Sequence, residues 1–129
     1  MKNSTMEPIL PLGFTQEQLD NLQGVPILVL EDRHFVYCND AAVELLGYNT
    51  RSDLIESHPF MLSPQYQPDG QPSATKANYM IDIARISGYH CFDWQHKSKN
   101  GNLIDLQVSI HHSKWHDGKK CFLVQWTLL

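Results

Sequence analysis

The chain has 129 residues, of which 42% are hydrophobic and 10% aromatic, as in one ordinary globular domain with its own core. A net charge of −4 without any basic cluster argues against nucleic acid and anionic membranes as partners. No apolar run approaches the roughly 18–20 residues of a membrane span, and the N-terminus lacks a signal-peptide core, so we expect a cytoplasmic chain without membrane insertion.

The first predicted element is a short helix over residues 15–23. Thr15 is a suitable N-cap, and Gln18 stands three residues later at the capping-box position. Leu19 and Leu22 are three residues apart and therefore share one side of this helix.

A hairpin and a second short helix are predicted next. Two apolar segments, residues 27–30 and 34–39, are separated by a turn at Asp32-Arg33 that is too tight for anything but a hairpin. A helix follows over residues 39–48. Its candidate N-caps and its C-terminal glycine are Asn39, Asp40 and Gly47.

The stretch LSPQYQPDGQPS, residues 62–73, interrupts this pattern with three prolines and a Pro-Asp-Gly turn. Each proline lacks a donor N–H and fixes φ, so the stretch is neither helix nor central strand. We predict a surface loop over residues 64–72 that carries the chain across the helical layer. Its prolines lower the entropy of the unfolded loop, which makes ordering it less costly.

The clearest helix follows over residues 73–88, with Ser73 as its expected N-cap and Gly88 at its end. Apolar residues recur at helical spacing along it, at Ala77, Met80, Ile81 and Ala84.

Three β segments complete the chain, over residues 89–97, 102–113 and 120–129. They are separated by Asn100-Gly101 and Asp117-Gly118, which are the strongest short hairpin signals. We therefore predict an antiparallel meander whose buried face packs against the helices, giving an α+β fold.

A ligand pocket is predicted between the long helix and the concave face of the sheet. Such a pocket is mainly apolar, with one or two polar groups such as Tyr79 or a histidine. The alternative for each residue is that it only fills the core. The candidate ligand-binding residues are Tyr79, Met80 and Ile83 on the helix and Leu106, Val108 and Ile110 on the sheet.

Two motifs give this sequence a family resemblance. ILVLEDRHFVYCNDAAVELLGY and KSKNGNLIDLQVSI follow the pattern of the PAS domain family, and the chain resembles that family over residues 24–128. The resemblance implies a five-stranded antiparallel sheet with short helices and one longer helix packed on one face. Residues 1–23 would then be an N-terminal extension, and residues 24–129 the PAS sensor domain.

The resemblance also implies a role in signal transduction. LSPQYQPDGQPS followed by FDWQHKSKNG is similar to a subgroup that is often fused to GGDEF diguanylate cyclases or other bacterial signalling outputs. It implies a sensory module that binds a small ligand or a partner and regulates a C-terminal output domain that this chain does not contain.

Catalytic and cofactor motifs are scarce in this sequence. There is no P-loop, nucleophile elbow or GGDEF motif, so we expect no enzyme activity, and a small enzyme using histidines as acid–base groups is the competing hypothesis. No zinc set has customary spacing, and Cys38 lies outside the box that flavin-binding relatives require. His58 is the candidate axial ligand if the chain is a haem-based gas or redox sensor. Free thiols are expected at Cys38, Cys91 and Cys121.

Self-association is predicted from the N-terminal segment. Phe14, Leu19 and Leu22 have no evident place to bury within the family's core, and exposed apolar stripes commonly mark an interface. We therefore expect a homodimer, and the alternative is that the helix folds back on its own sheet. Leu123 or Trp126, depending on strand parity, would receive it in either arrangement.

Overall fold

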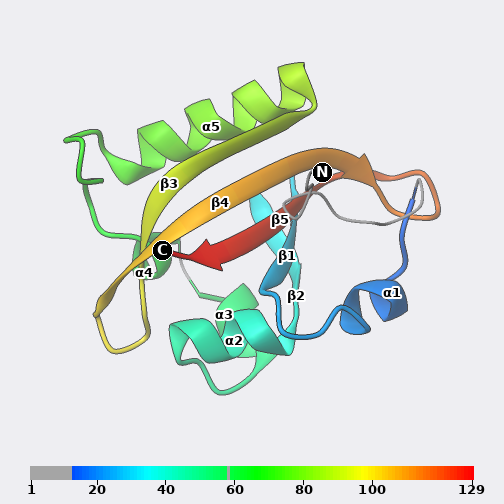
Figure 1. Cartoon of the computed structure of the whole chain (residues 1–129), viewed down its shortest axis with the longest axis horizontal. Helices are drawn as coiled ribbons and strands as arrows, with labels where there is room; N and C mark the ends of the chain where they lie inside the picture. The colour runs from blue at the N-terminus through cyan, green and yellow to red at the C-terminus, as the bar shows by residue number, and fades with distance from the viewer. Residues whose placement is uncertain (1–12, 58) are drawn as a thin grey trace.

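A single antiparallel sheet organises the protein, whose computed structural model describes residues 13–57 and 59–129. The strands lie in the order β2-β1-β5-β4-β3 (Figure 1). Their bounds are β1 Ile27–Glu31, β2 His34–Cys38, β3 Tyr89–Lys97, β4 Leu103–Lys114 and β5 Lys120–Leu128. The predicted α+β fold with five antiparallel strands is confirmed.

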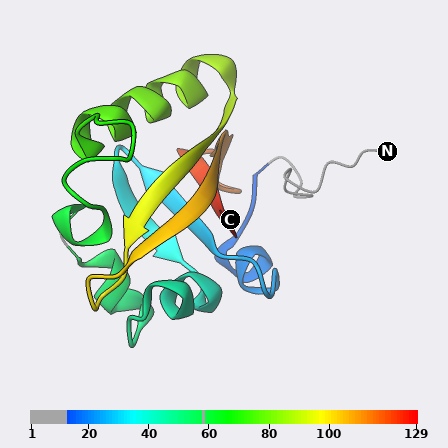
Figure 2. The ribbon, with the colours of Figure 1, turned by 60° about the vertical axis from the view of Figure 1, so that its left-hand side comes forward.

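Helices lie on both faces of this sheet. The four that pack on the inner face are α2 Asp40–Leu46, α3 Arg51–Ile55, α4 Pro59–Leu62 and α5 Ser73–Ser87. The longest of them, α5, runs beside β3 and β4 (Figures 1 and 2). The short helix α1, Gln16–Asp20, packs on the outer face instead. Among the described residues, no helix is both long enough and apolar enough to cross a bilayer.

The turns form as the sequence predicts. Asp32 and Arg33 have φ of 47° and 71°, and positive φ at both central residues is what a two-residue type I′ hairpin requires. Gly101 and Gly118 have φ near 90° in the two turns of the β3-β4-β5 meander. Residues within each turn therefore account for the three short connections of the sheet, β1-β2, β3-β4 and β4-β5.

The start of α5 differs from the prediction. Ser73 is the first residue of the helix rather than its N-cap, and Pro72 stands at the N-cap position without a side-chain hydrogen bond. The Ser73 hydroxyl donates to the backbone oxygen of Pro64 and accepts from the amide of Gln67. The preceding loop folds back over the helix start, so it uses the hydroxyl that was expected to cap the helix.

The predicted surface loop over residues 64–72 is only partly on the surface. Gln67 has just 2% of its surface exposed and is inserted against the edge of β3. Asp69 remains on the surface, where it accepts hydrogen bonds from the Gln71 backbone and from Lys76. The loop is thus held by one buried amide and one exposed carboxylate.

The N-terminal helix covers its own sheet, which removes the basis of the predicted dimer interface. Thr15 and Gln18 form the expected capping box. Phe14 and Leu19 are fully buried against the outer face, because burying an open sheet face is favourable within one chain as well as between two. Their neighbours, including the partly buried Leu22, form a second core with Ile27, Val29, Tyr37, Cys121 and Leu123. Trp126 lies on the opposite, inner face. The homodimer itself stays a prediction.

Candidate ligand-binding cavity

A cavity of about 620 Å³ lies between the inner face of the sheet and the helices. This volume is within the range of small-molecule sites in proteins. Most of its wall is apolar, and no aspartate or glutamate lines it in the part of the chain that the structure describes. The apolar wall is formed by Leu30, Phe35, Ile55, Leu62, Ala77, Ile81, Phe92, Trp94, Val108, Ile110, Val124 and Trp126.

Two of the three candidate residues on the sheet line this cavity, whereas none of the three on the helix does. Val108 and Ile110 line it, whereas Leu106 is fully buried in the same core without reaching the cavity. Whether any of them binds a ligand stays a prediction.

The predicted face of α5 was wrong. Tyr79 is 60% exposed, and neither Met80 nor Ile83 lines the cavity. The helix turns Ala74, Ala77 and Ile81 toward the cavity instead. With 3.6 residues per turn, a residue two positions from Ala77 or Ile81 lies on nearly the opposite side, which places Tyr79 in solvent.

A polar cluster forms part of the cavity wall. The Nδ1 atom of His96 lies 2.7 Å from the backbone oxygen of Leu62 and 3.3 Å from the Ser63 hydroxyl. The Ser63 hydroxyl also accepts from the indole N–H of Trp94 at 3.1 Å. Burial lowers the pKa of His96 to about 4, against a weaker opposing effect of the Leu62 hydrogen bond. His96 is therefore neutral at pH 7.

His96 also belongs to a chain of five aromatic rings along the cavity wall. Its ring centroid lies 4.6 Å from that of Trp126 and 6.3 Å from that of Trp94. Phe35 extends the chain beyond Trp126, and Phe92 extends it beyond Trp94. Phe92, Trp94 and His96 alternate along β3 and therefore share one face of the strand, which is a signal that the sequence carries. The contribution of Ser63 had no such signal.

The tip of the β1-β2 hairpin is fastened to α5 at the cavity wall. Arg33 lines the cavity and donates to Asn78 at 2.9 Å and to Asp82 at 3.1 Å. The Arg33–Asp82 pair is about 40% exposed on both sides, so it contributes little to stability. Its effect is to position the hairpin tip beside the helix.

The sequence matches the family model described as a PAS domain over residues 24–127. The chain belongs to the PAS domain family. The resemblance predicted from the two sequence motifs is thereby confirmed, and the fusion to a GGDEF output stays a prediction. Among curated proteins, none has a sequence that matches this PAS domain.

Solved PAS structures share this fold. The PAS domain of a LuxR-family transcriptional regulator from Burkholderia thailandensis, in complex with ethanol, superposes with a TM-score of 0.67 at 17% identity, over 90% of this chain and 98% of that one. A PAS domain from a two-component sensor histidine kinase superposes with a TM-score of 0.65 at 17% identity, over 87% of this chain and 91% of that one. A Rhodobacter sphaeroides LOV protein superposes with a TM-score of 0.64 at 17% identity, over 90% of this chain and 69% of that one. At these identities the similarity establishes the fold alone.

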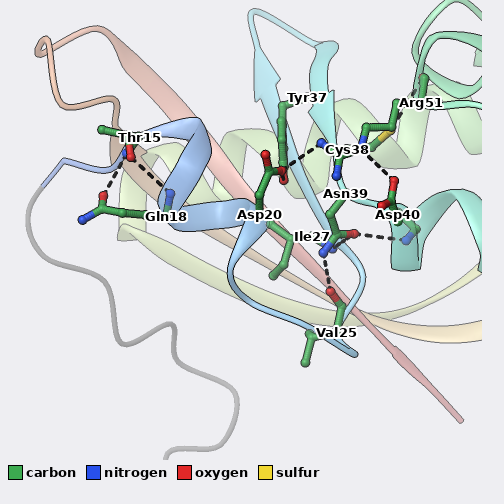
Figure 3. Close-up of polar contacts among 11 residues, drawn as sticks. Thr15, Gln18, Asp20, Val25, Ile27, Tyr37, Cys38, Asn39, Asp40 and Arg51 are labelled. Carbon is green, nitrogen blue, oxygen red and sulfur yellow. Dashed lines mark hydrogen bonds and ion pairs between the residues drawn. The ribbon is translucent and has the colours of Figure 1, made fainter.

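In this PAS domain, the side chain of Asn39 connects the segment that leads into β1 with the start of α2 (Figure 3). Its side-chain oxygen accepts from the backbone N–H of Ile27 at 3.0 Å and of Ala42 at 3.1 Å, and its amide donates to the oxygen of Val25 at 2.7 Å. Three hydrogen bonds of this junction therefore depend on one side chain, which the sequence had identified only as one of two candidate caps.

A second network fastens α1 to α3 around the edge strand β2 (Figure 3). Tyr37 donates to Asp20, and Arg51 donates to Asp20 at 2.8 Å and to Asp40 at 2.9 Å. The hydrogen bond from Tyr37 and the neighbouring Arg51 lower the pKa of Asp20. Because α3 also carries Ile55 of the cavity wall, this network connects the outer helix with the cavity side of the sheet.

The residues considered for metal, haem and flavin chemistry do not form one site in the part of the chain that the structure describes. No three histidine, cysteine, aspartate or glutamate side chains in that part of the chain lie close enough to hold a metal ion. His58, the candidate haem ligand, lies outside the described residues. Cys38 is a free buried thiol whose pKa burial raises to about 11, and it does not line the cavity. Cys38 therefore lies away from any molecule bound in the cavity.

Proposed function

We propose that this PAS domain is a sensory module that binds a small, mainly apolar molecule in the cavity and passes the signal to an output domain outside this chain. The single observation that carries the proposal is the cavity itself, because it is large enough for a small molecule and lined mainly by apolar and aromatic side chains with a few polar groups. A diguanylate cyclase or a similar signalling enzyme is the output that we propose from the sequence pattern.

Binding is favoured over catalysis by the surroundings of His96. A catalytic histidine needs a carboxylate or a similar group that orients it and stabilises its charged form. His96 donates to a backbone carbonyl instead, its pKa is low, and no carboxylate lines the cavity within the described residues. The competing hypothesis of a small acid–base enzyme therefore lacks its key geometry.

Native mass spectrometry of the protein purified from its own cells tests the proposal. We expect a retained small molecule that disappears in Ala77→Phe, because this change fills the cavity from α5. Tyr79→Phe is the matched control, since Tyr79 points into solvent on the same helix. Retention by both variants would contradict the cavity as the binding site. A retained haem would support the alternative based on His58.

A further inference from the structure

The proton on His96 has a determined position. A backbone carbonyl oxygen accepts hydrogen bonds and cannot donate them, so the 2.7 Å contact with Leu62 requires a proton on Nδ1 of His96. A neutral imidazole carries only one proton, which leaves Nε2 as an acceptor.

This acceptor has no partner in the part of the protein that the structure describes. The hydrogen-bond contacts of His96 with Leu62 and Ser63 both involve Nδ1. The side chain is 8% exposed, and Nε2 is not sealed inside the protein in the way that the unpaired indole nitrogen of Trp126 is. His96 lines the cavity, and Nε2 is the ring nitrogen that remains available to a molecule bound there.

The surrounding wall favours a flat, uncharged occupant. Four further aromatic rings flank His96 in a continuous chain, and aromatic side chains pack well against the faces and edges of planar rings. A charged group placed among them would lose its hydration without gaining an ion pair. The charged residues that line the cavity within the described part of the chain are Arg33 and Lys97. Arg33 is already paired with Asp82, and Lys97 follows His96 in β3, so strand alternation turns its side chain away from the face that His96 occupies.

We propose that the cavity binds a neutral planar aromatic molecule with one hydrogen-bond donor, such as a phenolic hydroxyl or a ring N–H, which Nε2 of His96 accepts. This inference rests on the proposed function, because it names the class of ligand for the same cavity. The ring chain supplies the apolar contact, and His96 selects for the donor.

Calorimetric titration of the intact protein with matched probes tests this inference. We expect 2-naphthol to bind about 5- to 10-fold more tightly than 2-methoxynaphthalene, whose oxygen has no proton to donate. Indole should show the same preference over N-methylindole, and 2-naphthoate should bind more weakly than 2-naphthol because it is charged. These comparisons need no variant, so they hold even where a variant of His96 fails to fold.

Two variants test whether His96 causes the preference for probes with a hydrogen-bond donor. His96→Phe should bind both naphthalene probes with nearly equal affinity, because it keeps the ring and removes the acceptor. Ser63→Ala should keep the preference, because the hydrogen bond from His96 to Leu62 remains. Equal binding of donor and donor-free probes by the unmodified protein would overturn the role of His96 while leaving the cavity as a binding site. Binding of none of the probes would contradict the aromatic ligand class, and retention of the native molecule would show whether the proposed function survives.

Discussion

The side-chain amide of Gln67 pairs with the backbone of Gln95 in the same way that a neighbouring strand would. Its Oε1 accepts from the N–H of Gln95 at 2.8 Å, and its Nε2 donates to the oxygen of Gln95 at 3.1 Å. Because β3 is an edge strand, these two backbone groups have no further strand to pair with. One loop residue thus completes the edge of the sheet.

Gln67→Glu should destabilise the protein by about 2–4 kcal/mol at pH 7, because a buried carboxylate cannot donate to Gln95 and is itself costly to bury. Burial raises the pKa of the introduced carboxyl, so the folded state binds its proton first and part of the lost stability returns as the pH falls. Urea titrations at several pH values measure this. Gln65→Glu, at an exposed position of the same loop, is the control and should change stability little. Equal losses for both variants would contradict the role of Gln67.

His96 predicts a pH dependence of stability. Its pKa is about 4 in the folded protein and about 6.5 when unfolded, so only the unfolded state binds the proton between these values. Stability should be complete above about pH 6.5 and fall by roughly 3 kcal/mol as the pH approaches 4. His96→Gln should remove this part of the slope, and subtracting its urea titrations from those of the parent cancels the other histidines. Parallel profiles would show that His96 does not titrate in this way.

Asn39→Ala should cost about 2–4 kcal/mol, because it removes three hydrogen bonds and leaves buried groups of Ile27 and Val25 without their partner. Thr50→Ala is a matched control at the start of α3, where the lost side chain accepts one exposed N-cap bond. We expect only about 0.5–2 kcal/mol there. Thermal or urea unfolding measures both, and a cost at Asn39 no greater than at Thr50 would mean that Asn39 acts as a cap alone.

Removal of residues 1–22 should make the protein associate. The shortened chain loses Phe14 and Leu19 and exposes the outer-face cluster around Val29 and Leu123. Sedimentation at tens of micromolar should show more self-association than in the intact protein. An intact dimer that becomes monomeric after truncation would instead restore the N-terminal helix as the dimer interface.

Leu19→Ala in the intact chain is a milder version of the same test. It should cost about 2–5 kcal/mol, the usual range for a leucine deleted from a well-packed core, because Leu19 is fully buried. A change near zero would mean that α1 leaves the sheet easily in solution.

The sequence alone determined the features that depend on near neighbours. The capping box of Thr15 and Gln18, the hairpin at Asp32-Arg33 and the glycine turns at Gly101 and Gly118 all formed as predicted. Each depends on contacts or backbone angles within a few residues, and these are present in any window of the chain. The alternation of β4 likewise identified Val108 and Ile110 as residues of the inner face.

Tertiary structure decided the rest. The spacing of Ala77, Met80, Ile81 and Ala84 indicated the inward side of α5, but only the tertiary structure decided that Ala77 and Ile81 line the cavity while Met80 and Ala84 are buried without lining it. The burial of Gln67 depends on a backbone pair 28 residues away, and the tautomer of His96 depends on a carbonyl 34 residues away. The position of α1 depended on which apolar surface was left uncovered once the sheet had formed. Such contacts arise only when distant segments meet, and no local pattern encodes them.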